Sequence, residues 1–285
     1  MIVLITGSNG LLGQKILENL RKNDYTIIAT SKDENRVKQD NFYTYESLDI
    51  TQEKEVNRVL NLYSPDVVFN TAAMTNVDLC ETERAICDKL NVDAVGFLAN
   101  SCLKIDAHLI HISTDFIFDG NDGPYSENDI ANPLSYYGKS KYKSEKLLNT
   151  HLCKSSILRT IVLFGIAENL TKNNIVLWAK DQLENSNKIN IIDDEFRAPT
   201  LAEDLAEACV LVAQKKAFGV FHICGKDLMS IYEMVVAIAN FYNFDVNLIN
   251  RISAAKLNQK AKRPPKTGFI LDKAINKLGY NPHSF

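Results

Sequence analysis

Near its amino terminus the chain reads Ile2-Val3-Leu4-Ile5-Thr6-Gly7-Ser8-Asn9-Gly10-Leu11-Leu12-Gly13. The apolar run predicts a buried strand over residues 2–6, and the apolar spacing after the turn predicts a helix over residues 11–21. Gly7 allows a tight turn, Gly10 lets backbone N–H groups approach a pyrophosphate, and Gly13 permits close helix–strand packing. The partial positive charge of a helix amino terminus favours the same ligand. The stretch therefore predicts a dinucleotide-binding unit, although glycines that serve the turn alone are the simpler alternative.

Strands and helices alternate over the first two-thirds of the chain. Nearly continuous apolar runs are typical of parallel strands that helices cover on both faces. The predicted fold class is therefore α/β, a doubly wound Rossmann-type parallel sheet. Expected strands are residues 2–6, 26–30, 67–70, 109–113 and 156–160, and expected helices are residues 11–21, 52–63, 81–103 and 135–148.

The pattern changes after about residue 165. Helices are predicted over residues 174–185, 201–214 and 230–242, with strands over 188–192 and near 220–223. We interpret residues 1–165 plus about 193–225 as the dinucleotide-binding domain. Residues of about 166–192 and 226–285 then form a smaller C-terminal lobe for the substrate.

The composition is that of a globular protein with a large core. Among 285 residues, 46% are hydrophobic and 24% charged, and the net charge of −3 gives no electrostatic surface for nucleic acid or an anionic membrane. The short apolar start predicts a strand and no signal peptide, and no apolar stretch approaches the roughly 18–20 residues of a membrane span. Six scattered cysteines without a C-x-x-C pair indicate reduced thiols, a cytoplasmic location and no metal site.

The end of the second expected strand bears on which dinucleotide is bound. A site selective for NAD places an acidic side chain there to accept from the ribose 2′-hydroxyl. Here the strand ends at Ser31 and Lys32, and Asp33 lies just beyond. A hydroxyl and a cation suit a 2′-phosphate, so we predict NADPH as the cofactor. NADH stays open because Asp33 could turn inward.

Tyr137 and Lys141 lie one helical turn apart at the start of the expected helix 135–148 and share a face. A phenol has an ordinary pKa near 10, and a neighbouring ammonium lowers it. The tyrosine could then donate its proton to a carbonyl oxygen as hydride arrives from a nicotinamide, while the lysine holds the ribose. The same spacing recurs at Tyr142 and Lys146, but five residues turn a helix by about 140°. We choose the first pair because it is nearer the helix start.

A hydroxyl is expected at the carboxyl end of strand 109–113, where ligands bind in open α/β sheets. The sequence there reads His111-Ile112-Ser113-Thr114-Asp115-Phe116. Thr114 is the candidate that orients and polarises a substrate carbonyl, and Ser113 is the alternative. A strand-end cap is the simpler explanation for either hydroxyl alone.

Several motifs in order resemble the extended short-chain dehydrogenases/reductases, and within them the dTDP-4-dehydrorhamnose reductase family. The motifs are Gly7-x-x-Gly10-x-x-Gly13, residues 113–120 (STDFIFDG) and residues 132–141 (NPLSYYGKSK), with further matches at residues 70–78 and 193–200. The resemblance runs from residue 1 to about residue 280. It implies an NAD(P)-dependent oxidoreductase that reduces a 4-keto nucleotide-sugar in dTDP-rhamnose synthesis.

The resemblance also implies roles for individual residues. Catalysis falls to Thr114, Tyr137 and Lys141, and sugar contacts fall to Thr75 and Asp115. Tyr137 and Lys141 also belong to the implied cofactor site, together with Gly7, Asn9, Gly10, Leu11, Asp49, Ile50, Ala72 and Ala73.

The basic segment 260–266 offers Arg263 for the diphosphate of a nucleotide-sugar. An arginine fork suits the geometry of phosphate oxygens. A solvated charged loop is the alternative for the same segment. The expected partner is a nucleotide-diphosphate sugar, and a homodimer is compatible with the resemblance.

Other activities share the implied fold. Dehydratases often carry a glutamate after the aspartate of the Thr-Asp motif, and Phe116 in that place argues against dehydration. A nucleotide-sugar epimerase stays open. So does a non-catalytic role, because the regulatory β subunit of methionine adenosyltransferase is similar to these reductases. Met74 stands where the family continues with tyrosine, and Ile161-Val162 where it often has tryptophan, so the sugar and nucleotide stay open.

Overall fold

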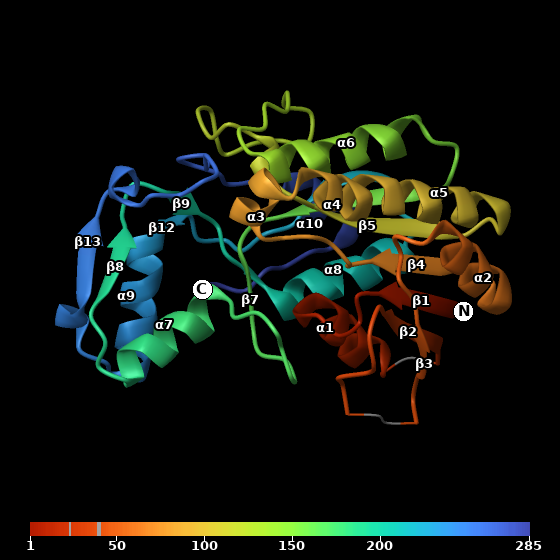
Figure 1. Ribbon diagram of the computed structural model, residues 1–285, viewed down its shortest axis with the longest axis horizontal. Helices are drawn as coiled ribbons and strands as arrows, with labels where there is room; N and C mark the ends of the chain where they lie inside the picture. Colours follow the sequence, from red (N-terminus) through yellow and green to blue (C-terminus); the bar gives the residue numbers. More distant parts are fainter. Residues whose placement is uncertain (23, 39–40) are drawn as a thin grey trace.

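The computed structural model describes residues 1–22, 24–38 and 41–285. Its centre is a seven-stranded sheet with parallel pairing between every pair of neighbours, in the order β11-β6-β5-β4-β1-β2-β3 (Figure 1). The strands are β1 (Ile2–Thr6), β2 (Thr26–Ser31), β3 (Thr44–Ser47), β4 (Val67–Asn70), β5 (His108–Thr114), β6 (Ser155–Thr160) and β11 (Gly219–His222). The order reverses between β1 and β4, as in a doubly wound fold, which confirms the predicted fold class.

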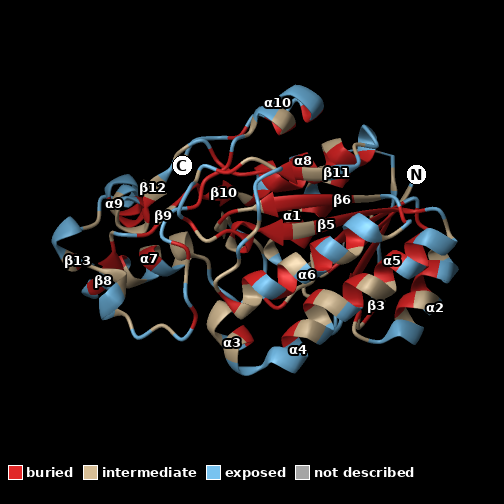
Figure 2. Ribbon diagram, turned by 90° about the horizontal axis from the view of Figure 1, so that it is seen from above, coloured by how far each residue is buried: buried red, intermediate tan, exposed pale blue. Residues whose placement is uncertain are grey.

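Helices cover both faces of this sheet (Figure 1). Along β1, Val3 and Ile5 pack into the core on one face, and Leu4 between them packs into the core on the other. This alternation follows from the two-residue repeat of a strand, and the red strands of Figure 2 show the burial it produces. One face carries α1 (Leu11–Leu20), α8 (Ala202–Gln214) and α10 (Asp272–Leu278), and the other carries α2 (Glu53–Tyr63), α5 (Ala94–Lys104) and α6 (Tyr136–Thr150).

A smaller lobe with its own hydrophobic core stands at one end of the sheet (Figure 1). It contains α7 (Ile175–Glu184), β8 (Ile189–Ile192), α9 (Ile231–Tyr242) and β13 (Ile249–Ile252). Strand β9 (Phe196–Arg197) pairs with β12 (Met229–Ser230) beside it. We expected residues 226–285 to lie in this lobe, but α10 returns to the large unit, because Ala274, Leu278 and Tyr280 join the core of α1 and α8.

The structure differs from the sequence-based expectation in other places as well. Strand β3 was not expected, because its four residues Thr44–Ser47 are exposed or half-buried and carry no apolar run. The single helix expected over residues 81–103 is divided into α3 (Val77–Thr82), α4 (Arg84–Asp88), a π-helical turn at Lys89–Asp93 and α5. Short strands β7 (Leu163–Phe164) and β10 (Thr200–Leu201) also pair in parallel. In the part of the chain that the structure describes, no helix combines the length and apolar character needed to cross a membrane.

Candidate active site

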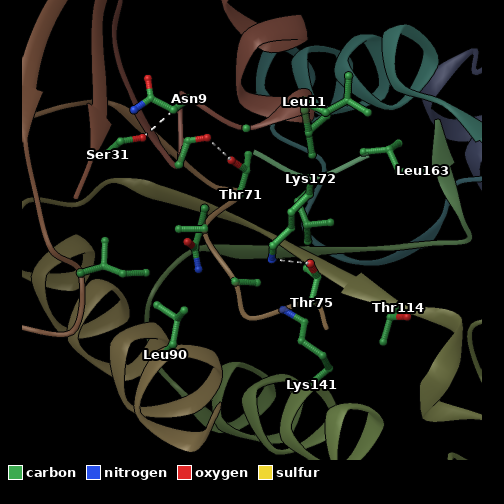
Figure 3. Close-up of a pocket in the computed structure, with 18 of the residues that line it drawn as sticks. Asn9, Leu11, Ser31, Thr71, Thr75, Leu90, Thr114, Lys141, Leu163 and Lys172 are labelled. Carbon is green, nitrogen blue, oxygen red and sulfur yellow. Dashed lines mark hydrogen bonds between the residues drawn. The ribbon is translucent and has the colours of Figure 1, made fainter. Parts of the chain in front are cut away.

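A cleft of about 940 Å³ lies at the carboxyl ends of the central strands, beside the point where the strand order reverses. Open α/β sheets bind their ligands at this place. The glycine turn and the end of β2 form one end of the cleft, and the end of β5 and the start of α6 form the other (Figure 3). The predicted site residues that line it are Gly7, Asn9, Gly10, Leu11, Ser31, Lys32, Asp49, Ile50, Ala72, Ala73, Thr75, Thr114, Asp115, Tyr137 and Lys141.

The glycine turn has the shape that a dinucleotide pyrophosphate requires. Gly7 adopts φ +70°, and a Cβ there would lie 2.9 Å from the backbone nitrogen of Ala72. Gly13 does not line the cleft; a Cβ there would lie 2.4 Å from the Gly7 carbonyl oxygen, so it serves the close helix–strand packing. Helix α1 begins after Gly10 with no side-chain cap and no acidic residue in its first turn. The turn therefore leaves backbone and a positive helix end for an anionic group, and its residues fit the cofactor.

The residues after β2 present cations to the cleft. Ser31, Lys32 and Arg36 line it, and the Ser31 hydroxyl accepts a hydrogen bond from the Asn9 backbone at 3.1 Å. The Lys32 ammonium is 3.3 Å from the Asp49 carboxylate. Asp33 is not part of the cleft wall, and its carboxylate pairs with Arg36 at 3.0 Å. Asp33, the acidic side chain that could have selected NADH, is thus paired with Arg36 outside the cleft wall.

Thr114, Tyr137 and Lys141 come together at the other end of the cleft. Thr114 ends β5, and α6 begins at Tyr136 because the Ser135 side chain caps it through the Gly138 N–H. This start places Tyr137 in the first turn and Lys141 one turn later. The ring of Tyr137 packs edge-on against Phe116, with centroids 5.9 Å apart. The cap on α6 therefore aims the tyrosine and the lysine at the end of β5.

Burial sets the protonation of these groups. It raises the pKa of Tyr137 well above the ordinary range, against a smaller lowering by a hydrogen bond with the Thr114 hydroxyl. Burial also lowers the pKa of Lys141 to about 8. We expected the ammonium to lower the pKa of the phenol. That expectation is wrong for this structure, because Lys141 Nζ contacts His111 Nε2 at 3.0 Å and desolvation dominates at the tyrosine.

The second tyrosine–lysine pair lies outside the cleft wall. The Lys146 ammonium sits over the ring of its own partner Tyr142, 4.7 Å from the centroid. Tyr142 packs against the core cluster that contains Ile117 and Phe118. The rotation of the helix between the two pairs therefore separates them as the sequence predicted.

Asp115 lines the cleft, but its oxygens are used within the protein. Its carboxylate accepts hydrogen bonds from the Thr114 hydroxyl at 3.1 Å and the Thr267 hydroxyl at 2.5 Å. Arg197 lies 3.8 Å away. Burial raises the pKa of Asp115, while Arg197 opposes the shift. Asp115 thus fixes the Thr114 side chain and ties β5 to the segment that carries Thr267.

Arg263 is not among the residues that line the cleft. Its guanidinium pairs with the Asp78 carboxylate at 2.7 Å, and Asp78 also accepts from the Ala261 N–H at 2.9 Å. The arginine expected to reach a diphosphate is therefore held against α3. The sequence of residues 260–266 does not indicate that Arg263 pairs with the distant Asp78.

Sequence reasoning missed some cleft residues. Lys172 lies in the segment before α7, and its ammonium donates to the Thr75 hydroxyl at 3.5 Å (Figure 3). A cation two residues before the capping Asn174 was the signal that could have indicated it. Arg36 also lines the cleft beside Lys32, and it was not among the expected site residues.

The family model for the RmlD substrate binding domain matches residues 1–285. The chain belongs to this family. A dTDP-4-dehydrorhamnose reductase of Aggregatibacter actinomycetemcomitans is 32% identical over 98% of this chain and 94% of its own length. The expected resemblance is thereby confirmed, and so is the prediction of an NAD(P)-dependent oxidoreductase of the short-chain type. Subunit β of bovine methionine adenosyltransferase 2 is 34% identical over 85% of this chain and 72% of its own length.

Solved structures agree with the fold. A dTDP-4-dehydrorhamnose reductase of Clostridium acetobutylicum has a TM-score of 0.86 at 31% identity, covering 97% of this chain and 92% of its own. The Bacillus anthracis reductase, solved in complex with NADP, has a TM-score of 0.87 at 26% identity and covers 99% of this chain and 94% of its own.

Proposed function

We propose that this chain is an NADPH-dependent reductase of a 4-keto nucleotide-sugar, with dTDP-4-dehydrorhamnose as its substrate. One observation carries the proposal: Thr114, Tyr137 and Lys141 line one end of a cleft whose other end is the glycine turn. Two hydroxyls so placed can both bind one carbonyl oxygen. The reductase of Aggregatibacter actinomycetemcomitans supports the choice of substrate.

The residues in the walls of the cleft support the choice of NADPH. The glycine turn at Gly7 and Gly10 would hold the pyrophosphate, and Ser31, Lys32 and Arg36 would bind the 2′-phosphate of NADPH. The Bacillus anthracis reductase in complex with NADP supports this choice.

The side chains of the protein supply the proton for the carbonyl oxygen and a positive charge beside it. When bound, the reduced nicotinamide supplies the hydride. Tyr137 stays protonated at neutral pH because burial raises its pKa, and it donates that proton to the carbonyl oxygen. The Thr114 hydroxyl, which donates to Asp115 in this structure, would turn to donate its hydrogen bond to the same oxygen. Lys141, with a pKa of about 8, is mostly an ammonium at pH 7 and favours the negative charge that develops there.

The test is a measurement of NADPH oxidation at 340 nm. We expect the pure protein to oxidise one NADPH for each dTDP-4-dehydrorhamnose reduced, and to use NADH less well. A UDP-linked 4-keto sugar serves as the comparison for nucleotide choice. Sugar conversion at constant absorbance would contradict the reductase and favour the epimerase.

A non-catalytic role is the second candidate, and the similarity to subunit β of bovine methionine adenosyltransferase 2 favours it. The two candidates differ in what Tyr137 does. A reductase loses turnover when Tyr137 is replaced by phenylalanine, whereas a regulatory subunit keeps its effect on its partner. Absence of NADPH oxidation with every 4-keto nucleotide-sugar, combined with retained NADPH binding, would favour the regulatory role.

A further inference from the structure

A buried histidine stands directly behind the lysine of the site. His111 lies in β5 with 1% of its surface exposed. Its Nε2 is 3.0 Å from Lys141 Nζ and 3.2 Å from the Ser144 hydroxyl, both on α6. Its Nδ1 is 3.1 Å from the side-chain amide nitrogen of Asn70, at the end of β4. The imidazole therefore bridges two strands and the helix that carries the catalytic pair.

The bridge continues into the glycine turn. The Thr6 hydroxyl, at the end of β1, donates to the Asn70 amide oxygen at 2.7 Å. The amide nitrogen of Asn70 consequently faces His111, and Nδ1 of the ring is the acceptor of that bond. Rotation of the amide by 180° exchanges its oxygen and nitrogen with almost no movement of heavy atoms. The ring is therefore satisfied at Nδ1 whether or not that nitrogen carries the proton.

This arrangement matches both forms of Lys141. When the lysine is an ammonium, it donates to Nε2 and the ring proton lies on Nδ1. The rotated amide oxygen of Asn70 accepts that proton, and the Thr6 hydroxyl turns to accept from the amide nitrogen. When the lysine has lost a proton, Nε2–H donates to the amine and the amide nitrogen donates to Nδ1. The ring keeps one proton in both states, because burial holds the pKa of His111 well below its ordinary value and the Lys141 charge adds to the effect.

We propose that Asn70 and His111 form an uncharged relay that holds Lys141 by a hydrogen bond in both of its protonation states, which makes His111 a positioning residue of this site. The role in turnover rests on the proposed reductase function; the contact itself does not. A lysine ammonium has three donors, so two stay available for the cleft while one is bound to the ring.

The groups around Lys141 come from different elements. Glu145, one turn further along α6, favours the ammonium but is itself paired with Arg159 of β6 at 2.7 Å. The Cys87 thiol of α4 favours it to a smaller extent. Within the described part of the chain neither group is hydrogen-bonded to Nζ, whereas His111 is. Loss of the imidazole therefore leaves the buried ammonium without its neutral acceptor.

His108 provides a matched control on the same strand. It is also buried, and its Nε2 bonds the Ser156 hydroxyl at 2.7 Å, away from the cleft. Its Nδ1 has no hydrogen-bond partner within the described ranges of the chain, so its replacement by leucine removes a single bond. Both His→Leu changes delete a buried ring from β5, but only His111→Leu removes the acceptor of Lys141.

The test is a titration of the protein alone, without NADPH or sugar. Lysine labelled with ¹³C at Cε reports the titration midpoint of Lys141, and Lys141→Met assigns its signal. We expect His111→Leu to lower this midpoint by about one pH unit, because the ring's hydrogen bond to the charged ammonium is stronger than its bond to the neutral amine. His108→Leu should leave it unchanged. Equal midpoints in the wild type and His111→Leu would overturn the relay.

A second measurement uses the wild type, so it does not depend on the folding of a variant. The ¹⁵N shifts of the His111 ring report which nitrogen carries the proton. We expect the proton to move from Nδ1 to Nε2 as Lys141 titrates, and to show no such change in Lys141→Met. A ring that keeps one tautomer through the Lys141 titration contradicts the proposal.

Activity then separates this inference from the proposed function. With NADPH and dTDP-4-dehydrorhamnose, the alkaline limb of kcat/KM in His111→Leu should move to lower pH by the same amount as the Lys141 midpoint. A lack of NADPH oxidation by the wild type removes the reductase proposal but leaves the titration result standing. An unshifted limb in an active His111→Leu enzyme refutes the relay and leaves the reductase intact.

Discussion

At the scale of single residues, the site depends on which proton each group keeps. The hydroxyl of Tyr137 stays neutral because burial raises its pKa. Burial also lowers the pKa of Lys141 to about 8, which is close to neutral pH. A neutral phenol is the form that can give a proton to a carbonyl oxygen. The two shifts have the same cause, desolvation of the charged form, and opposite directions because one group ionises to an anion and the other to a cation.

Replacing Tyr137 by phenylalanine tests the role of the phenol. The ring and its edge contact with Phe116 remain, so only the proton donor is lost. We expect kcat for NADPH oxidation to fall by about 10²–10⁴-fold, the usual contribution of general acid catalysis. The Kd for NADPH, measured by its fluorescence, should stay within a factor of a few. Tyr142→Phe, in the pair outside the cleft, should leave kcat unchanged.

Arg36 tests which cofactor the cleft selects. It stands beside Lys32 in the cleft wall, and its pair with the exposed carboxylate of Asp33 is weak enough to give way to a 2′-phosphate. We expect Arg36→Ala to raise the Kd for NADPH by roughly 10- to 100-fold, the loss of a hydrogen bond to a charged group, with little change for NADH. Lys54→Ala, an exposed cation in α2, is the control for general charge effects. Equal weakening of NADPH and NADH would argue against a phosphate contact.

At the scale of elements, the glycine turn requires glycine for helix packing as much as for ligand binding. A Cβ on Gly13 would lie 2.4 Å from the Gly7 carbonyl oxygen and 2.6 Å from Ser8 Cα. Both neighbours are backbone atoms, which cannot rotate away. Gly96 in α5 differs, since a Cβ there would meet only the end of the Leu147 side chain at 3.4 Å.

This difference predicts opposite effects on stability. Gly13→Ala should lower the free energy of unfolding by about 1–3 kcal/mol through overpacking, and it should weaken NADPH binding as the turn is displaced. Gly96→Ala should raise the free energy of unfolding by about 0.5–1 kcal/mol, because alanine loses less backbone entropy in a helix. Urea unfolding of both variants measures the effects. A stable Gly13→Ala protein that still binds NADPH would show that helix α1 can shift without cost.

Elements with a strong local signal could be predicted from the sequence, and those that depend on distant neighbours could not. The buried strands and the capped start of α6 carry apolar runs or a capping Ser135, so they are found close to the expected places. Strand β3, with the sequence Thr44-Tyr45-Glu46-Ser47, has no apolar run, and within the described residues its strand partner is β2. The π-helical turn at Lys89–Asp93 lies within a continuous helical pattern, yet it brings the Asn91 amide to the Met74 backbone at 2.8 Å and the Ser140 hydroxyl at 3.0 Å.

At the scale of the whole molecule, the chain returns from the small lobe to the large unit through residues 253–271. This return segment is tied to the large unit by polar contacts. Thr267 bonds Asp115 of β5, and Arg263 pairs with Asp78 of α3. These contacts hold the return segment against β5 and α3. Arg263 therefore holds this segment in the structure, in contrast to the diphosphate contact that its sequence suggested.

Arg263→Gln separates these two roles. The Arg263 guanidinium lowers the pKa of Asp78 below its ordinary 3.8, so the pair stabilises the fold above that pH and the effect is lost as the pH falls through the lower folded-state pKa. Because the Asp78 side chain is 37% exposed, we expect a loss of less than about 1 kcal/mol at pH 7, which vanishes in strong acid. Arg251→Gln, whose partner Asp193 lies beside the small lobe's own strands, is the control.

Kinetics of the same variant complete the test. If Arg263 only holds the return segment, KM for the nucleotide-sugar in Arg263→Gln should stay within about threefold of the wild type, since an indirect shift costs less than a lost charged hydrogen bond. A KM raised by about tenfold or more, with stability unchanged, would instead restore the diphosphate contact. The structure favours the first outcome because both Asp78 oxygens already bind the guanidinium. An arginine that must first leave a carboxylate gains little from a phosphate placed at the same distance.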